Sequence, residues 1–518
     1  MSAQVTLPGR RWSRLRLAEG PLASGLLPLL AVGLGGLGAG FTLWYVAVSG
    51  VAIARERSEV TLVLALALAL AAAYAGWTWY GAYFARRAGI AELRSLRWDA
   101  ATWLGGAVAA AGILAPSSRA TPALGIAAGI AIFTLGKLAV AARFTATVRI
   151  VLTTFVVTRL PIIVVAELAS TFIAQRPGQH VSTSSNAMLA AWGRWDAVHY
   201  LAIARSGYYG FDVAFFPLFP ALVHVVGRLI GSEIIAGLIV SNVALLFGLL
   251  FFYKLVELEF DRRVARNAIF YVSIFPTAIF FSAVYTESLF FALTVASFYY
   301  IRRRRWLTAG AIGVFASLTR VEGILLAVPY AIEGVVALRA LPDLRSPATY
   351  VRFGRFAVGI VGFPLGIGIY MAYLWALVGD PIAFSHAQVH WDRHLAPPWA
   401  SAIHSYRIVH KSLHAGLYAA FATQGIEIAF TLLMIVVLLA ALTRLRPSYL
   451  AYMALSILVP MSTSSLMSMP RFALVLFPMF IVLALWGRRP AVNATIVAFS
   501  LPLLGLFTVL FADWYWVA

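Results

Sequence analysis

The chain has 518 residues, of which 62% are hydrophobic and 12% are charged. Soluble globular chains are about 45–50% apolar and about 25% charged, so this composition excludes a soluble domain and indicates a protein that crosses a membrane many times. The net charge of +20 would suit a nucleic-acid partner in a soluble protein. Here the arginines lie in short clusters between apolar stretches, which is typical of cytoplasmic loops and leaves no basic face for nucleic acid. With no cysteine present, no disulfide or thiolate metal site is expected.

Residues 1–145 are expected to form a separate N-terminal set of extra membrane helices of unassigned role. The basic start, Arg10 to Arg14, has no evident cleavage site after the apolar run and favours an uncleaved signal anchor. Arginine-rich loops place the N-terminus in the cytoplasm. The expected spans lie near 22–48, 59–84, 102–117 and 121–142.

Residues 146–518 are expected to form the rest of an all-α bundle, giving about 13–15 spans in total. A shorter apolar stretch at 217–230 is expected to be a helix that lies at the outer membrane interface. The other predicted spans lie near 149–174, 234–255, 266–283, 306–321, 323–340, 356–378, 424–442, 448–463, 471–486 and 490–512, with one more span ending at Arg302.

Two long polar segments, near 175–233 and 379–420, fall on the outer face in this topology. All nine histidines lie in them, whereas the inner loops hold mostly arginine. We therefore expect the chemistry of the protein on the outer face of the membrane, with the inner face setting orientation.

The segment 192–200 is the most polar and aromatic stretch of the first outer loop. Asp196, His199 and Tyr200 have the spacing i, i+3 and i+4, so they share a face if the segment is helical. A carboxylate beside an imidazole and a phenol can position a hydroxyl group and accept its proton. A solvated loop aspartate between interfacial tryptophans fits the same spacing, and the pattern alone leaves both interpretations open.

Four charged residues are predicted at or near membrane level: Glu287, Arg320, Glu322 and Arg471. Ionised groups are costly there and often functional. The arginines could hold a phosphate through forked hydrogen bonds, or arginine–glutamate pairs could fix the packing of the helices. Glu167 and Glu427, also within predicted spans, are expected only to hold helices together.

His386, His390 and His394 are spaced four apart and would line one face of a helix. Such a face could bind zinc, contact a phosphate or sugar, or belong to a plain amphipathic helix. No glutamate completes the His-Glu-x-x-His arrangement of a metalloprotease.

Several short motifs in order resemble the PIG-V mannosyltransferases, relatives of the second mannosyltransferase of glycosylphosphatidylinositol anchor synthesis. The resemblance covers roughly 150–490, and no motif of 1–145 contributes to it. The motifs are Trp195-Asp196, His199-Tyr200, Gly207-Tyr208, Phe216-Pro217-Leu218-Phe219-Pro220, Ser282 to Ser288, Leu318-Thr319-Arg320, Gly379-Asp380-Pro381 to Phe384 with Gln388 and Trp391, and Met469-Pro470-Arg471-Phe472 with Phe477-Pro478.

The resemblance implies a GT-C glycosyltransferase, a bundle of membrane helices that takes its sugar from a polyprenyl phosphate. It implies that the acidic residue of the first outer loop, Asp196, is the catalytic base, and that transfer needs no metal or other cofactor. It places the active site on the lumenal side, or on the periplasmic or exterior side in bacteria. The arginine and alanine usage favours a bacterial protein in the cell membrane. Five spans before the first outer loop, instead of one, depart from the family pattern.

The expected reaction is inverting transfer of a hexose, preferably mannose, to a hydroxyl of a glycolipid, glycan or protein. Arg471 is the first choice for the donor phosphate, followed by Arg320 and His390, and aromatic side chains would contact the sugar or the first isoprenes. A transporter or lipid flippase is the alternative, but it favours an internal inverted repeat that the sequence does not show. A non-catalytic scaffold is a third interpretation. The expected substrate-binding set is Arg194, Trp195, His199, Tyr200, Tyr208, Glu287, Arg320, Gln388, His390 and Arg471.

Overall fold

The computed structural model describes residues 146–178, 181–340 and 346–517. The chain divides into two compact units, Met1–Arg149 and Ile150–Ala518, and the described residues belong almost entirely to the second. The four spans predicted before residue 145, and the signal anchor, lie outside the described residues.

The described part of the chain is built from helices, and its only β-type pairing is an isolated bridge between Leu395 and Thr463. The prediction of an all-α membrane protein is thus confirmed. In chain order the helices are α5 (Ala146–Phe172), α6 (Ala187–Ala190), α7 (Asp196–Ser206), η1 (Gly210–Ala214), α8 (Leu218–Ile230), α9 (Glu233–Glu259), α10 (Arg262–Ser273), η2 (Ala278–Phe281), α11 (Glu287–Arg302), α12 (Trp306–Thr319), η3 (Val321–Leu326), α13 (Ala327–Arg339), α14 (Pro347–Ile360), α15 (Gly362–Val378), α16 (Ala383–His386), η4 (Ala387–Trp391), α17 (Pro398–His414), α18 (Tyr418–Ala441), α19 (Pro447–Met461), α20 (Met469–Val475), α21 (Phe477–Trp486) and α22 (Pro490–Ala512).

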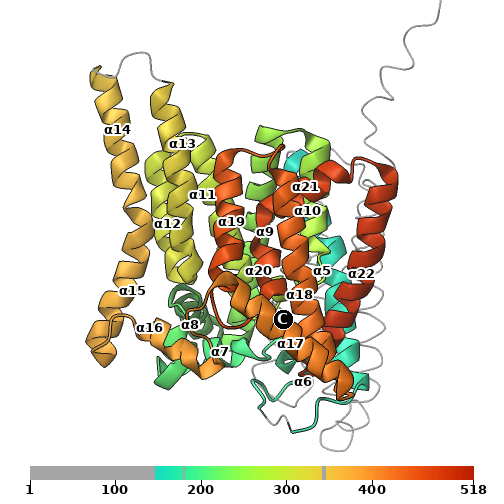
Figure 1. The fold of residues 1–518 in the computed structure, drawn as a ribbon. Coiled ribbons are helices and arrows are strands. Elements are labelled where there is room, and N and C mark those ends of the chain that lie inside the picture. The colour runs from blue at the N-terminus through green and yellow to red at the C-terminus, as the bar shows by residue number, and fades with distance from the viewer. Residues whose placement is uncertain (1–145, 179–180, 341–345, 518) are drawn as a thin grey trace, which may run out of the picture. The chain divides into compact units, whose positions relative to one another are not determined.

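Six of these helical segments are long and apolar enough to cross a membrane, or seven if the bent pair α20 and α21 counts as one span. They include the continuous run through α14 and α15, which lie end to end at one edge of the bundle in Figure 1. The predicted short helix after Pro217 is confirmed as α8, and its place at the membrane interface stays a prediction. The total of about 13–15 spans also stays a prediction, because 1–145 cannot be counted.

The predicted span at 266–283 is wrong, because the helix breaks in its middle. α10 ends at Ser273, and only a short η2 turn follows at Ala278–Phe281. Pro276 explains the break, since proline lacks the backbone N–H and disfavours a helical conformation in the residue before it. The buried Arg159 of α5 satisfies the freed carbonyl groups: its Nη1 donates to Ala278 O at 2.8 Å, and its Nη2 donates to Ser273 O.

Replacing Arg159 with leucine is expected to lower the thermal stability of the protein in detergent. The carbonyls of Ser273 and Ala278 would stay buried without this donor, and each buried unsatisfied group costs about 1–3 kcal/mol. The melting temperature of the purified variant, followed by tryptophan fluorescence, measures the effect. Arg205→Leu, which removes an exposed arginine from α7, is the control and should change the melting temperature little. Equal melting temperatures for Arg159→Leu and wild type would contradict this role.

The predicted span at 471–486 is also not a single helix. α20 and α21 meet at Leu476 with a bend of 74°. The bend lies just before Phe477-Pro478, where the proline cannot continue the hydrogen bonding of the preceding turn. As a result α20 is a short helix with its own direction, and it carries Arg471 into the interior.

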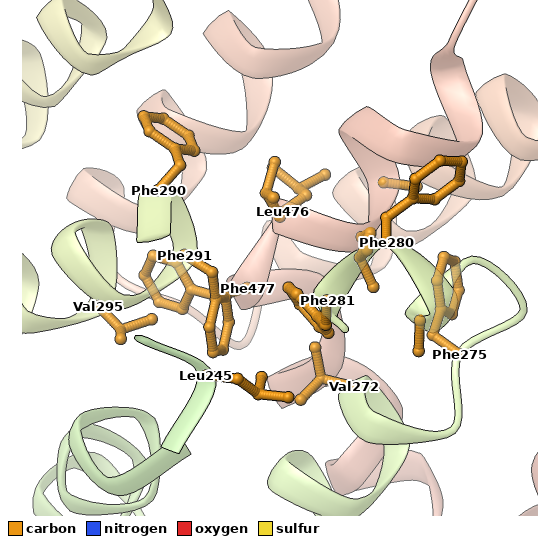
Figure 2. Close-up of a cluster of buried hydrophobic side chains, with 14 of the residues drawn as sticks. Leu245, Val272, Phe275, Phe280, Phe281, Phe290, Phe291, Val295, Leu476 and Phe477 are labelled. Atoms are coloured by element: carbon orange, nitrogen blue, oxygen red, sulfur yellow. The ribbon is translucent and has the colours of Figure 1, made fainter. Parts of the chain in front are cut away.

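The hydrophobic core gathers around these two breaks. Figure 2 shows Phe281 of η2, Phe291 of α11 and Phe477 at the start of α21 in one cluster. Phe281 and Phe291 have ring centroids 5.3 Å apart, and Phe477 packs 4.8 Å from Phe298. Burial of aromatic rings on this scale holds the broken segments in place even though their helical hydrogen bonding is interrupted.

The two ends of the bundle differ in the residues that they carry. Helices α7, α8, α16 and α17, which carry most of the described histidines, lie toward the same end in Figure 1. At the arginine-rich helix ends, Arg302 of α11 forms an ion pair with Glu333 of α13 at 2.6 Å. Arg446, at the start of α19, forms an ion pair with Glu259 of α9 at 2.9 Å. The structure therefore keeps the separation of histidines from arginine clusters that the sequence indicated.

Candidate active site

Asp196 is the first residue of α7, so the condition under which Asp196, His199 and Tyr200 share a helical face is met. The chain enters this helix through Trp195, which has φ 55°. Gly193 lies so close to its neighbours that an added Cβ would be 2.3 Å from Thr183 Oγ1. This tight entry fixes the place where the carboxylate of Asp196 emerges.

The Asp196 carboxylate is one end of a row of alternating charges. Arg471 Nη1 donates to Asp196 Oδ2 at 2.7 Å, its Nε donates to Glu287 Oε1 at 2.8 Å, and its Nη2 lies 2.8 Å from the same Glu287 oxygen. Arg320 Nη1 lies 3.1 Å from the same Glu287 oxygen, and Arg320 Nη2 lies 3.4 Å from Glu322 Oε1. All four membrane-level residues singled out in the sequence thus belong to one network that ends on Asp196.

The network is inside the protein at one end and accessible at the other. The Glu287 side chain is fully buried, whereas the Asp196 side chain is 22% exposed. Buried charges require partners and hydrogen bonds to be tolerated. Glu287 therefore serves to hold Arg471 and Arg320, while Asp196 presents the charge that a ligand can reach.

The broken segment after α10 supplies the aromatic surroundings of Arg471. The Arg471 guanidinium carbon lies 4.9 Å from the ring centroid of Tyr285 and 5.2 Å from that of Phe280, which is cation–π geometry. Tyr285 Oη donates to the Arg194 carbonyl at 3.0 Å, which ties this segment to the entry of α7. The helix break therefore helps to position both partners of the Asp196–Arg471 pair.

Asp196 opens into a cavity of about 520 Å³. Residues of the two predicted outer segments, of α12 and η3, and of the loop before α20 line it. Of the predicted site residues, Asp196, Tyr200, Arg320, Gln388 and Arg471 reach its wall. The other lining residues are Ala214, Phe215, Phe216, Thr319, Val321, Glu322, Phe384, Ser385, His386, Val389, Trp391, Arg393, His394, Leu395, Val459, Pro460, Ser462, Thr463, Met467, Ser468, Phe472 and Trp516.

The remaining predicted site residues do not line the cavity. Glu287 lies behind Arg471. Arg194 is buried, and its Nε donates to the Ala512 carbonyl at 3.0 Å. Trp195 contacts Trp516 edge to face, with ring centroids 5.1 Å apart. These three residues pack behind the residues that line the cavity. Their direct contact with a substrate stays a prediction.

His199, Tyr208 and His390 also support the wall. His199 Nδ1 lies 2.8 Å from Asp212 Oδ1, and its ring stacks on Phe215. Tyr208 Oη donates to the Phe215 carbonyl at 2.9 Å. His390 is exposed and stacks on an aromatic ring of η1, Phe211, with centroids 3.8 Å apart.

The expectation that His386, His390 and His394 line one helical face is wrong. α16 ends at His386, the η4 turn follows, and Asp392 takes the left-handed conformation with φ 53°. His386 Nδ1 instead lies 2.7 Å from Asp380 Oδ2, and this hydrogen bond holds the pKa of Asp380 below its ordinary value. Within the described ranges no three His, Asp or Glu side chains are grouped so that they could hold a metal ion.

Arg393, Trp516 and Glu427 stand out among the residues at the site that were not predicted as site residues from the sequence. Arg393 and Trp516 line the cavity. Glu427, expected only to join helices, accepts the backbone N–H groups of Ser468 at 3.0 Å and Met469 at 2.9 Å and so fixes the start of α20. An arginine two positions after Trp391 in an outer segment was a usable signal, whereas the roles of Glu427 and Trp516 depend on contacts across the fold.

Comparison with known families agrees with the motifs. Residues 135–339, less than half of the chain, match the family described as mannosyltransferase (PIG-V). Over this range the match agrees with the family and with the enzyme class, a glycosyltransferase, that the motifs indicated. The matched range contains Asp196, Glu287 and Arg320 but ends before Arg471, which the fold brings to them. Among curated proteins no match is found.

Two solved structures of the Archaeoglobus fulgidus oligosaccharyltransferase are also similar. One is a complex with Zn and sulfate, at 14% identity, TM-score 0.32, and coverage of 68% of this chain and 53% of that chain. The other is tethered with an acceptor peptide containing the NVT sequon via a disulfide bond, at 13% identity, TM-score 0.32, and coverage of 69% and 55%. This chain spans about half of their length. A similarity this low says nothing about the site of this chain.

Proposed function

We propose that this membrane glycosyltransferase, a PIG-V family member by its residues 135–339, transfers a hexose from a polyprenyl phosphate to an acceptor hydroxyl, with Asp196 as the base. Mannose is the preferred hexose, and a glycolipid or glycan is the preferred acceptor. One observation carries the proposal: the Asp196 carboxylate is anchored by Arg471 at 2.7 Å on one oxygen and opens into a cavity of about 520 Å³.

In the proposed reaction, the acceptor oxygen attacks the anomeric carbon from the face opposite the phosphate. The C–O bond to phosphate breaks, the polyprenyl phosphate leaves, and Asp196 accepts the hydroxyl proton, so the anomeric configuration inverts. A general base must lie within hydrogen-bond reach of the proton that it takes. Arg471 occupies Oδ2 of Asp196, and the described residues donate no hydrogen bond to Oδ1, so Oδ1 is the oxygen that would receive the proton.

One carboxylate suffices for this chemistry. A glycosidase needs a second carboxylic acid to protonate a poor leaving group, whereas a phosphate leaves readily and needs its developing charge stabilised. The second carboxylate of the network, Glu287, is fully buried and bound to two arginines. This arrangement matches a role in holding cations better than a role in proton transfer.

The size and lining of the cavity support a lipid-linked sugar as the donor. Ligand sites of about 300–1,000 Å³ are usual for small molecules, so a hexose with its phosphate fits the volume. Trp391, Trp516 and Tyr200 offer ring surfaces to a sugar, and Leu395 and Phe472 offer apolar contacts to the first isoprene units. The histidine-bearing end of the bundle is proposed to face the periplasm or cell exterior, with the protein in the cell membrane.

Incubation of the purified full-length protein with polyprenyl-phosphate mannose, polyprenyl-phosphate glucose and a membrane extract tests the proposal. Mass spectrometry should detect a new glycolipid or glycan that gains 1 hexose, with release of polyprenyl phosphate. NMR of the product should show the anomeric configuration opposite to that of the donor. Absence of transfer from every polyprenyl-phosphate sugar, or a product with retained configuration, would overturn the proposal.

A further inference from the structure

Three guanidinium groups line the cavity, and they differ in whether a carboxylate neutralises them. Arg471 is bonded to Asp196 and Glu287, and Arg320 is bonded to Glu287 and Glu322. Arg393 has no ion pair with any carboxylate of the described residues. Its Nη2 donates to the Met467 carbonyl at 2.7 Å, and its buried Nε has no hydrogen-bond partner there. A buried donor without a partner is rare and needs an explanation, and a bound ion is one of the recognised explanations.

The backbone around Arg393 is held firmly. Its N–H donates to the Gln388 carbonyl at 3.2 Å, which follows from the left-handed turn at Asp392. The next residues pair with the loop before α20: Ser464 N–H donates to the His394 carbonyl at 3.0 Å, and Ser464 Oγ donates to the Asp392 carbonyl at 2.6 Å. The position of the guanidinium is therefore set before any ligand binds, which lowers the entropy cost of binding.

Electrostatics favour an anion at this position. Burial lowers the pKa of Arg393 below its ordinary value, because the surroundings penalise its charge; the nearby carboxylates of Asp196, Glu427 and Glu322 oppose the shift, and the charge of Arg471 adds to it. A bound anion would remove that penalty. An arginine fork matches the oxygens of a phosphate in two parallel hydrogen bonds, which a lysine ammonium cannot reproduce.

We infer that Arg393 binds the phosphate of the lipid-linked donor and stabilises the second negative charge that forms on it when the sugar leaves. The inference deepens the proposed function and depends on it. In the donor the phosphate is a diester with 1 negative charge; after the bond to the anomeric carbon breaks, it is a monoester that carries 2. Arg393 forms no carboxylate ion pair and so has a donor free for that charge, whereas Arg471 and Arg320 are already bonded to carboxylates.

This assignment differs from the sequence-based expectation that Arg471 is the first choice for the phosphate. Two nitrogens of Arg471 already donate hydrogen bonds to carboxylate oxygens, and the third lies 2.8 Å from one. Binding a phosphate there would compete with Asp196, the proposed base. Arg393 can bind it without disturbing the network.

The test combines a binding measurement with donor kinetics on the full-length protein. Polyprenyl phosphate without sugar should raise the melting temperature of wild type, and neutral polyprenol and phosphatidylglycerol vesicles should not. Arg393→Gln should lose this shift and should lower kcat/KM for the donor by about 10- to 100-fold, the usual effect of losing a charged hydrogen bond. The KM for the acceptor should stay unchanged. Arg205→Gln, an exposed arginine of α7, is the matched control and should behave as wild type.

The outcomes separate the inference from the proposed function. A wild type that transfers sugar while Arg393→Gln keeps the donor kinetics and the thermal shift would overturn the inference alone. A wild type that neither transfers sugar nor responds to polyprenyl phosphate would overturn the proposed function itself. If the glutamine variant does not fold, Arg393→Lys serves as the test. Lysine keeps the charge but lacks the forked guanidinium, so kcat/KM for the donor should fall at least several-fold. Wild-type values would count against the inference.

Discussion

Asp196→Asn is expected to abolish sugar transfer while the protein stays folded. Asparagine has the shape of aspartate and keeps one oxygen that can accept the bond from Arg471, so the network that ends at Asp196 retains its geometry. The amide cannot take a proton from the acceptor hydroxyl. Loss of a positioned general base lowers rates by about 10²–10⁴-fold, and the turnover number for donor and acceptor at saturation measures it.

Two further measurements make this result specific to the base. The melting temperature of Asp196→Asn and its thermal shift with polyprenyl phosphate should be close to those of wild type. Asp212→Asn, which changes the carboxylate next to His199 outside the cavity lining, should retain most of the activity. Turnover by Asp196→Asn within a few-fold of wild type would mean that another group accepts the proton.

Arg471→Gln is expected to cause the largest combined loss of stability and activity. Glu287 is fully buried and shares one oxygen between Arg471 and Arg320. Removing Arg471 leaves this charge with one partner, and breaking a buried pair from one side costs about 3–5 kcal/mol. Activity should fall together with stability, because Asp196 loses the group that orients it. Thermal unfolding in detergent and transfer kinetics measure the two effects.

The double variant Glu287→Gln with Arg471→Gln distinguishes the two losses. With the buried carboxylate also neutral, much of the lost stability should return, since the buried negative charge that had lost one of its two cations is gone. Activity should not return, because Asp196 is still without its anchor. A double variant less stable than Arg471→Gln alone would show that Glu287 stabilises the fold by itself and not through the arginines.

Much of the architecture followed from the sequence because apolar length and arginine clusters directly reflect the membrane. The two mistaken spans, at 266–283 and 471–486, share a cause. Both were predicted from hydropathy, which does not register that Pro276 and Pro478 interrupt helical hydrogen bonding. In a membrane such a break needs internal partners for the freed groups, and the partner at the first break, Arg159, lies in a helix distant in sequence.

The site was predictable in part for a similar reason. Asp196 and Arg471 stood out as charged residues in apolar or aromatic surroundings, and the motifs pointed to both. Their direct contact could not be predicted, because it depends on how α7 and α20 are placed by the whole bundle. Arg393 was overlooked because arginines are numerous in this chain; its place two residues after Trp391 was a usable signal, but its missing hydrogen-bond partner is visible only in the structure.

The Asp196–Arg471 pair also bears on how the enzyme is made. The two residues are separated by 275 positions in the chain, so translation and membrane insertion of most of the protein come between them. Until α20 has been inserted and has docked, Asp196 has no arginine beside it and Glu287 lacks one of its two cations. The centre proposed for sugar transfer is therefore incomplete until α20 is in place, so this short helix both adds to the fold and completes that centre.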